Sequence, residues 1–367
     1  MAKPVKAWSL FVHRLLGLSA GVVLLIMGIT GALLSFEHEL IYALNPATVT
    51  PRNEAPLSAP MLRQRLVPPA TSMVLTNLTL DGDPTHAGIA TFSDEHDDKV
   101  MLFNPYTAQI WPEHGIVYTL LVTQAIHRWL GIKTPGKAIT GTAALILMIL
   151  MITGLIRRAP KNISHLKLWF RWKTGLRGRA LLWQYHTTIG TWLFVPLLIA
   201  TLTGLTWSFD VYRTGLERVL SDHRAQSLPL LAPAPEHRIA LSNQAAIVMW
   251  QGFRNIAPDT QAYRWNEPLD GGEWPTLSFL PLKASYPTAM DDMTFDAKTG
   301  QLLQYDRYED RSARQKLMNI NYALHVGNYW GLMHQILMFI SALALTSFTI
   351  TGFWMYFSRK RVTNRNQ

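Results

Sequence analysis

Four long apolar runs constrain the fold of this chain more than any other feature. They cover residues 15–36, 139–156, 192–209 and 336–357, and none of them contains Asp, Glu, Lys or Arg. Each run has about the 17 to 25 residues that an α-helix needs to cross a bilayer. The sequence therefore predicts a membrane protein with an all-α core of four transmembrane helices.

The first run has an alternative interpretation, because Lys3 and Lys6 precede it as they would in a cleaved signal peptide. Its apolar stretch is too long for a signal peptide, and no small-x-small cleavage motif precedes Glu37. We expect it to remain as the first transmembrane helix.

Charge is distributed unevenly along the chain. Eight basic residues and no acid lie between Arg157 and Arg179, whereas all 24 acids lie in residues 37–138 and 210–335. Basic loops stay on the cytoplasmic side of a membrane. The pattern predicts a bacterial inner-membrane protein with both termini cytoplasmic and two long periplasmic loops. The net charge of +10 then reflects topology, and we expect the lipid bilayer, not a nucleic acid, as partner.

The helix–loop–helix pattern occurs twice. His13 and His186 each precede a Gly by four residues and a Thr-Gly pair by 17, and His127 and His325 each precede a Thr-Gly pair by 26. Alternating apolar residues in both loops predict short strands and turns, hence two small periplasmic α+β domains. The expected layout is helix 1 in 1–36, domain 1 in 37–138, helix 2 in 139–157, a basic loop in 158–183, helix 3 in 184–209, domain 2 in 210–334, helix 4 in 335–357 and a tail in 358–367.

The four repeated histidines are the main candidates for function. His13 and His186 fall near the cytoplasmic ends of helices 1 and 3, at matched depth, as two axial ligands of one haem require. His127 and His325 form a second matched pair near the outer surface. The chain has no cysteine, which excludes disulfides, Fe–S clusters and covalent haem attachment. Two haem b groups, one near each face, are the resulting prediction.

Other interpretations remain open. A single histidine at a membrane edge is usually an interfacial residue, and zinc or copper would need three or four ligands at one place. The 14 methionines fit helix packing better than axial ligation. His334 stays undecided, with a possible role at the outer site, and His38 fits an interfacial residue. The remaining histidines are interpreted as loop residues: His86, His96, His114, His165, His223 and His237.

Several segments together resemble the PepSY-associated transmembrane family of iron-regulated inner-membrane proteins over nearly the whole chain. They are 10–14 (LFVHR), 103–107 (FNPYT), 125–131 (AIHRWLG), 295–300 (FDAKTG) and 322–327 (YALHVG). In the first loop, Ala108 stands where the family turn usually has Gly.

Within that family the chain is most similar to FoxB-type di-haem ferric-siderophore reductases. This resemblance implies haem b ligation by His13, His127, His186 and His325, and reduction of a ferric siderophore on the periplasmic side. The electron donor would be a quinol or a cytoplasmic reductase. Two alternatives are a non-enzymatic PepSY module that binds a periplasmic peptide or protease, and a haem-binding electron carrier for another acceptor.

Overall fold

The computed structural model describes residues 3–44, 49–50, 54–68, 70–111, 115–159, 167, 169–220, 235–269 and 273–365. His114, His165 and His223 lie outside these residues. The chain forms two compact units. We call the first, which comprises Met1–Glu37, Leu120–Val219 and Asn321–Gln367, the membrane unit. The second, His38–Thr119 and Leu220–Ile320, is the sheet unit.

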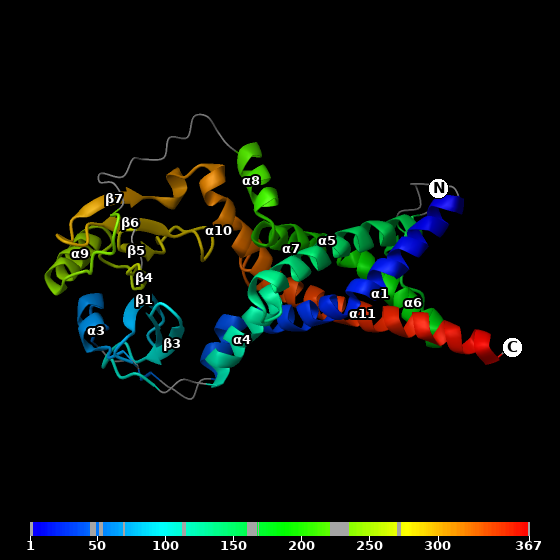
Figure 1. Ribbon diagram of the computed structural model, residues 1–367, viewed down its shortest axis with the longest axis horizontal. Helices are drawn as coiled ribbons and strands as arrows, with labels where there is room; N and C mark the ends of the chain where they lie inside the picture. Colours follow the sequence, from blue (N-terminus) through cyan, green and yellow to red (C-terminus); the bar gives the residue numbers. More distant parts are fainter. Residues whose placement is uncertain are drawn as a thin grey trace. The chain divides into compact units, whose positions relative to one another are not determined.

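Helices account for the membrane unit (Figure 1). Two of them, α4 and α10, begin in the sheet unit's residues and carry the chain into the membrane unit. The helices are α1 (Lys3–Leu34), α4 (Gly115–Trp129), α5 (Lys133–Arg158), α6 (Gly178–Trp192), α7 (Phe194–Ser208), α8 (Asp210–Val219), α10 (Ala313–Val326) and α11 (Leu332–Arg365).

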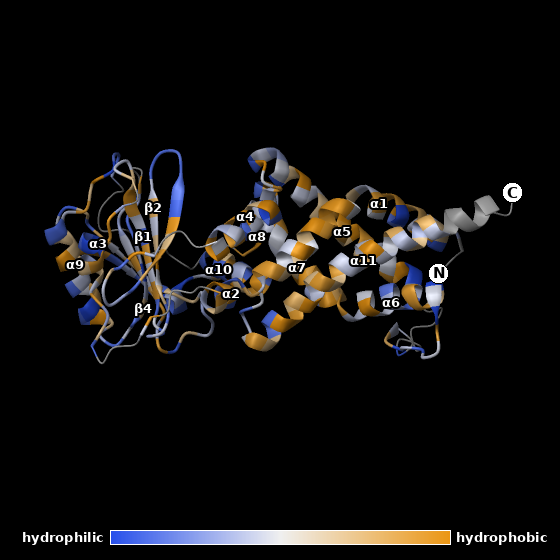
Figure 2. Ribbon diagram, turned by 90° about the horizontal axis from the view of Figure 1, so that it is seen from below, coloured by the Kyte–Doolittle hydropathy of each residue, from blue (hydrophilic) through white to orange (hydrophobic). Residues whose placement is uncertain are grey.

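Among the described residues, three helical segments are long and apolar enough to cross a membrane uninterrupted: Pro4–Leu34, Lys133–Arg158 and Leu332–Ser358. Hydrophobic colours predominate along α1, α5 and α7 in Figure 2. These spans confirm three of the four predicted transmembrane helices.

The predicted third helix is not a single straight span. It consists of α6 and α7, which meet at Leu193 with a bend of 64° and make a fourth span only if the pair is counted as one. Pro196 explains the break, because a proline at the third position of α7 has no N–H to donate and its ring would clash with the carbonyl of residue 192 in a continuous helix. The apolar run revealed the span's length but not this interruption.

Glycines let α1 pack closely against α11. A Cβ on Gly21 would lie 2.7 Å from the ring of Phe353, and one on Gly28 would lie 2.5 Å from Oγ1 of Thr346. Small residues allow such close backbone approach in membrane helix pairs, where van der Waals packing replaces the hydrophobic effect.

The two long loops form one sheet, where the sequence predicted two separate domains. Its seven strands are antiparallel in the order β3-β2-β1-β4-β5-β6-β7. The join is the pairing of β1 with β4, with Leu78 opposite Trp265. The strands are β1 (Val74–Asp81), β2 (Gly88–Ser93), β3 (Asp98–Phe103), β4 (Ala262–Asn266), β5 (Thr276–Phe279), β6 (Asp291–Phe295) and β7 (Leu302–Asp306).

One face of this sheet carries the core. Helices α3 (Ala59–Arg65) and α9 (Asn243–Ile256) cover it, with Leu62, Met249 and Phe253 fully buried against Trp265 and other strand residues. Ser242 caps α9 by accepting a hydrogen bond from the backbone N–H of Ala245 at 3.1 Å. The unit also contains α2 (Glu37–Leu44) from its second residue onward, and the short 3₁₀ helix η2 (Tyr308–Asp310).

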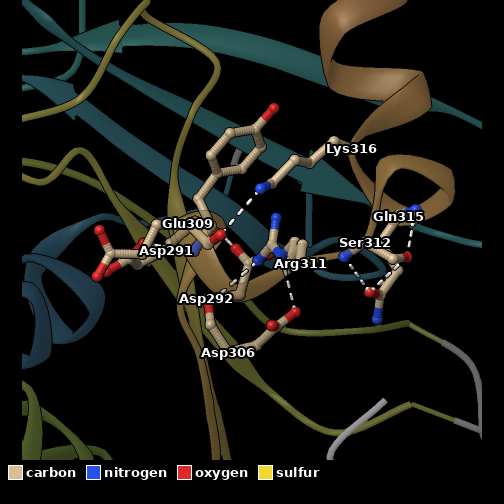
Figure 3. A network of polar contacts seen from close by, with 10 residues as sticks. Asp291, Asp292, Asp306, Glu309, Arg311, Ser312, Gln315 and Lys316 are labelled. Atoms are coloured by element: carbon tan, nitrogen blue, oxygen red, sulfur yellow. Dashed lines mark hydrogen bonds and ion pairs between the residues drawn. The ribbon is translucent and has the colours of Figure 1, made fainter. Parts of the chain in front are cut away.

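Alternate strand residues point to opposite sides of the sheet. The residues that point away from the core, such as Arg264 and Asn266 of β4, are polar, so the opposite face is polar. A hollow of about 560 Å³ lies on it, lined by Asn77, Arg264, Asn266, Thr276, Ser278, Asp292, Thr294, Gln304 and Asp306. Figure 3 shows the guanidinium of Arg311 joined to two of these carboxylates. It donates to Asp292 at 2.6 Å and to Asp306 at 2.8 Å, and these two charges raise its pKa against the opposing effect of burial.

A repeated turn closes the outer hairpin of each loop. In both turns the fifth residue donates its N–H to the carbonyl of the first, from Ala108 to Asn104 and from Gly300 to Asp296, each at 2.8 Å. Both fifth residues are left-handed, with φ of 61° at Ala108 and 73° at Gly300. The alanine noted in the sequence therefore occupies a conformation that glycine adopts without strain.

Candidate functional sites: two histidine pairs

The first pair consists of His13 on α1 and His186 on α6. Their ring centres are 6.2 Å apart and the ring planes are inclined by 75°. A metal ion about 2 Å from one nitrogen of each ring would hold the two ring centres about 6 to 6.5 Å apart. The two rings therefore have the spacing of two axial ligands on one metal centre.

The second pair, His127 on α4 and His325 on α10, has the same spacing. Its ring centres are also 6.2 Å apart, with an angle of 63° between the planes. The edge of Trp207 packs against His325 at 5.3 Å. The two pairs thus repeat one geometry within the membrane unit.

A threonine holds each of the four rings through its Nδ1 atom. The Nδ1–Oγ1 distances are 2.9 Å for His13 with Thr153, 2.9 Å for His127 with Thr30, 3.0 Å for His186 with Thr351 and 2.9 Å for His325 with Thr203. These are the threonines of the repeated Thr-Gly pairs. The sequence revealed their spacing, but not that each threonine contacts a histidine.

The threonine hydroxyls also determine which ring nitrogen is protonated. Each hydroxyl donates its own proton to a carbonyl four residues earlier in its helix, as Thr153 does to Ile149 at 2.8 Å and Thr203 does to Ile199 at 2.6 Å. Thr30 and Thr351 make the same bond. The hydroxyl oxygen therefore accepts from Nδ1–H, which leaves the lone pair of each ring on Nε2. An orienting hydrogen bond of this kind is what metal-bound histidines require.

The glycine of each Thr-Gly pair lies under the edge of the same ring. A Cβ at Gly31 would be 3.2 Å from Cε1 of His127, and one at Gly204 would be 3.4 Å from Cε1 of His325. The corresponding distances at the first pair are 3.7 Å for Gly154 and 3.8 Å for Gly352. A Cβ would press on the ring at Gly31, whereas at the other three glycines it would make an ordinary van der Waals contact.

The first pair opens into a cavity of about 880 Å³. Apolar side chains and glycines make up most of its lining, including Gly17, Leu150 and Phe348. Three arginines also line it: Arg14, Arg157 and Arg179. An apolar cavity with a basic border suits a flat hydrophobic group that carries carboxylates.

His334, the undecided residue, lies in the first turn of α11. It is 4% exposed and packs against Trp330, and neither of its ring nitrogens has a hydrogen-bond partner within the described part of the chain. A Cβ on Gly327, two residues after His325, would come within 2.8 Å of Cα of the neighbouring Gln335. A buried imidazole without such a partner calls for a polar group of a water or ligand to satisfy it.

The predicted pairing therefore agrees with the geometry, since the structure brings together His13 with His186 and His127 with His325. Ligation of haem by these rings stays a prediction. His38 and His86, which the sequence suggested were interfacial and loop residues, lie together in the sheet unit beside Asp81.

A search of the protein-family models matches residues 10–359 to the PepSY-associated TM region. Comparison with curated proteins finds no match.

Proposed function

Since this chain belongs to the PepSY-associated TM region family, we propose that it is an inner-membrane di-haem b protein that reduces ferric siderophores on the periplasmic side. The observation that carries the proposal is the pair of matched histidine sites, each with ring centres 6.2 Å apart. Along α1, His13 of the first site and Thr30, which holds His127 of the second, are 17 residues or about 25 Å apart. This separation suits electron transfer between the two faces of a membrane.

Four features of the membrane unit support haem as the bound group. His13 and His186 would hold one haem, and His127 and His325 the other, in each case through the unprotonated Nε2. The cavity at the first pair offers space and apolar walls, and its arginines would pair with the haem carboxylates. On the side of the second pair, the ring N–H of His334 would donate to a carboxylate. Zinc or copper fits less well, because the described residues bring no third His, Asp or Glu to either pair.

The bound haems would supply reversible one-electron redox chemistry, at potentials that the protein adjusts through ligands and burial. The chain's own residues would orient the iron ligands and exclude water. Electrons would come from a quinol or a cytoplasmic reductase. Transfer of an electron to a ferric chelate reduces Fe(III) to Fe(II) and weakens the chelate, because hard oxygen ligands favour the more highly charged ion. Outer-sphere transfer needs no general acid and no nucleophile.

The proposed topology follows from charge. Both termini and the basic segment between α5 and α6 would be cytoplasmic by the positive-inside rule, and the sheet unit would be periplasmic. A reporter protein that is active only in the cytoplasm should therefore be active when it is fused to the C-terminus.

A reduced-minus-oxidised spectrum of the detergent-purified chain, with haem counted per chain, tests the proposal. We expect b-type Soret and α bands and two haems per chain. Absence of these bands contradicts the redox function. Anaerobic mixing of the dithionite-reduced protein with a ferric hydroxamate should reoxidise the haems and yield Fe(II). Stable reduced bands in the presence of the chelate, with both haems bound, would instead indicate an electron carrier for a different acceptor.

A binding module without redox chemistry is the second candidate. The polar hollow on the open face of the sheet favours it, because nine polar side chains of five strands line a concave surface that suits a peptide or another hydrophilic ligand. This function would be supported if the chain bound no haem and the NMR signals of the Arg264 or Gln304 backbone amides shifted on addition of a peptide.

A further inference from the structure

Two histidines and an aspartate of the sheet unit come together although they are distant in the sequence. His38 lies in the first turn of α2, Asp81 ends β1, and His86 lies in the turn before β2. One ligand atom from each of the three lies within 4.8 Å of the other two. In the part of the chain that the structure describes, this is the one such group of three.

Asp81 is the centre of the group. Its Oδ2 lies 2.6 Å from Nδ1 of His86 and 3.3 Å from Nε2 of His38. Its other oxygen, Oδ1, accepts the backbone N–H of Asp83 at 3.0 Å. One carboxylate oxygen is thus fixed by the backbone while the other faces both imidazoles.

These separations are close to those of a coordination shell. Donor atoms around a tetrahedral ion with bonds of about 2.0 to 2.1 Å lie about 3.3 Å apart. The His38–Asp81 distance has this value, and the shorter His86–Asp81 distance is that of a charge-assisted hydrogen bond. A metal ion would replace the proton of that bond, as metal binding to histidine generally does.

Neighbouring residues orient the His86 ring. Tyr42 stacks on it with ring centres 3.7 Å apart and planes 6° from parallel. On the far side of the imidazole, Nε2 lies 3.9 Å from Oδ2 of Asp83. A proton moved from Nδ1 to Nε2 would face that carboxylate, which is the carboxylate–histidine–metal arrangement common around bound ions.

We propose that His38, Asp81 and His86 form a binding site for a divalent first-row transition-metal ion. Two imidazoles and one carboxylate are ligands that Fe(II) and Zn(II) both accept, and they leave coordination positions open for water or an exchanging ligand. His38 is exposed on 59% of its side chain, so the ion has access from solvent. Fe(II), the product of the proposed reduction, belongs to this class, and only that identification rests on the proposed function.

Zinc binding to the full-length, chelator-stripped protein tests the site. Equilibrium dialysis against micromolar Zn(II), with metal and haem measured per chain, should give one tightly bound ion. Asp81→Asn and His86→Phe, the latter retaining an aromatic ring on Tyr42, should weaken binding at least 100-fold. Asp83→Asn should weaken it by about 10- to 100-fold, as loss of an orienting partner does. His96→Gln, which removes a histidine beside another aspartate of the same unit, should bind as the wild type does.

Wild-type protein that binds no Zn(II), or variants that bind it as tightly as the wild type, would overturn the proposal. If Asp81→Asn or His86→Phe fails to fold, the solvent-exposed His38→Gln decides the matter. Anaerobic dialysis with Fe(II) then tests the identity of the ion: Zn(II) binding without Fe(II) binding leaves the site intact and removes its link to iron release. Loss of ferric-chelate reduction without loss of Zn(II) binding would affect only the proposed function.

Discussion

The two halves of the chain, residues 3–158 and 178–365, make different kinds of contact at the histidine sites. Every histidine–threonine hydrogen bond joins residues of the same half, as between His13 and Thr153. Every histidine pair joins residues of different halves, as between His13 and His186. At these two sites one half can therefore orient a ring, but only both halves together bring two rings to face each other. The sheet repeats this logic, since β1 of the first half pairs with β4 of the second.

The halves also differ. The first begins with one continuous helix of 32 residues, whereas its counterpart is bent at Leu193. The turn that ends in Gly300 in the second half ends in Ala108 in the first. The group of His38, Asp81 and His86 belongs to the first half. The histidine–threonine contacts are shared despite these differences, since the bent counterpart carries His186 on α6 and Thr203 on α7.

Loss of a ligand should have the largest effect. His13→Ala and His186→Ala should each remove one haem of two, and the double variant should remove no more, because both rings would hold the same group. His127→Ala and His325→Ala should likewise remove the other haem. Haem content per chain measures this, with His96→Ala as control. Two haems lost from a single substitution, or one lost only in the double variant, would break the assignment of each site to both halves.

The two repeated turns should respond unequally to exchange. In Gly300→Ala, the new Cβ would overlap the carbonyl oxygen of Ala245 on α9, and the left-handed backbone adds strain. We expect a loss of about 2 to 4 kcal/mol in the free energy of unfolding of the sheet unit. Ala108→Gly relieves strain but removes a buried methyl group worth about 0.8 kcal/mol, so stability should change by less than about 1 kcal/mol. Denaturant titration of the full chain measures both effects, and a loss of equal size in the two variants would contradict this prediction.

Removal of a threonine hydroxyl should weaken haem binding to a similar extent whichever half the threonine belongs to. Thr153→Val and Thr351→Val keep the side-chain volume but leave Nδ1 of His13 or His186 without its acceptor. Haem affinity at that site should fall about 10- to 100-fold, and the midpoint potential of that haem should shift while the other stays constant. Thr153→Ser and Thr351→Ser retain the hydroxyl and should behave as the wild type. A change at the distant site instead would contradict the pairing of threonines with rings.

Protonation of Asp81 in acid should produce the smallest effect, and only in the first half of the chain. Burial alone raises the pKa of Asp81, but the hydrogen bonds from His38 and His86 outweigh it and hold the pKa at about 2, below the usual 3.8. Its stabilising contribution is present above pH 3.8 and is lost as the pH falls toward 2. Amide hydrogen exchange in β1 should therefore accelerate over this interval. Asp81→Asn should abolish that acceleration, and an unchanged acid response in this variant would assign it to other carboxylates.

Local patterns predicted much of the fold. The apolar runs located three spans, and alternating apolar residues predicted short strands in both loops, where the structure has β1 to β3 and β4 to β7. Equal spacing in the two halves predicted which histidines would meet, because equal numbers of helical residues place side chains at equal depth. The bend at Leu193 was missed because the apolar run continues through Pro196, although a proline in a helical run is itself a signal for a break.

The sequence by itself determined that this chain enters a membrane, that its halves are repeats and that four histidines form two matched sets. Hydropathy and spacing are properties of short segments and survive without a partner. Only the tertiary structure decided that two loops build one sheet, that each Thr-Gly pair orients a histidine, and that His38, Asp81 and His86 meet. Those contacts join residues from 5 positions apart, as between His86 and Asp81, to 189 positions apart, as between Asn77 and Asn266. Their formation depends on how helices and strands pack against each other.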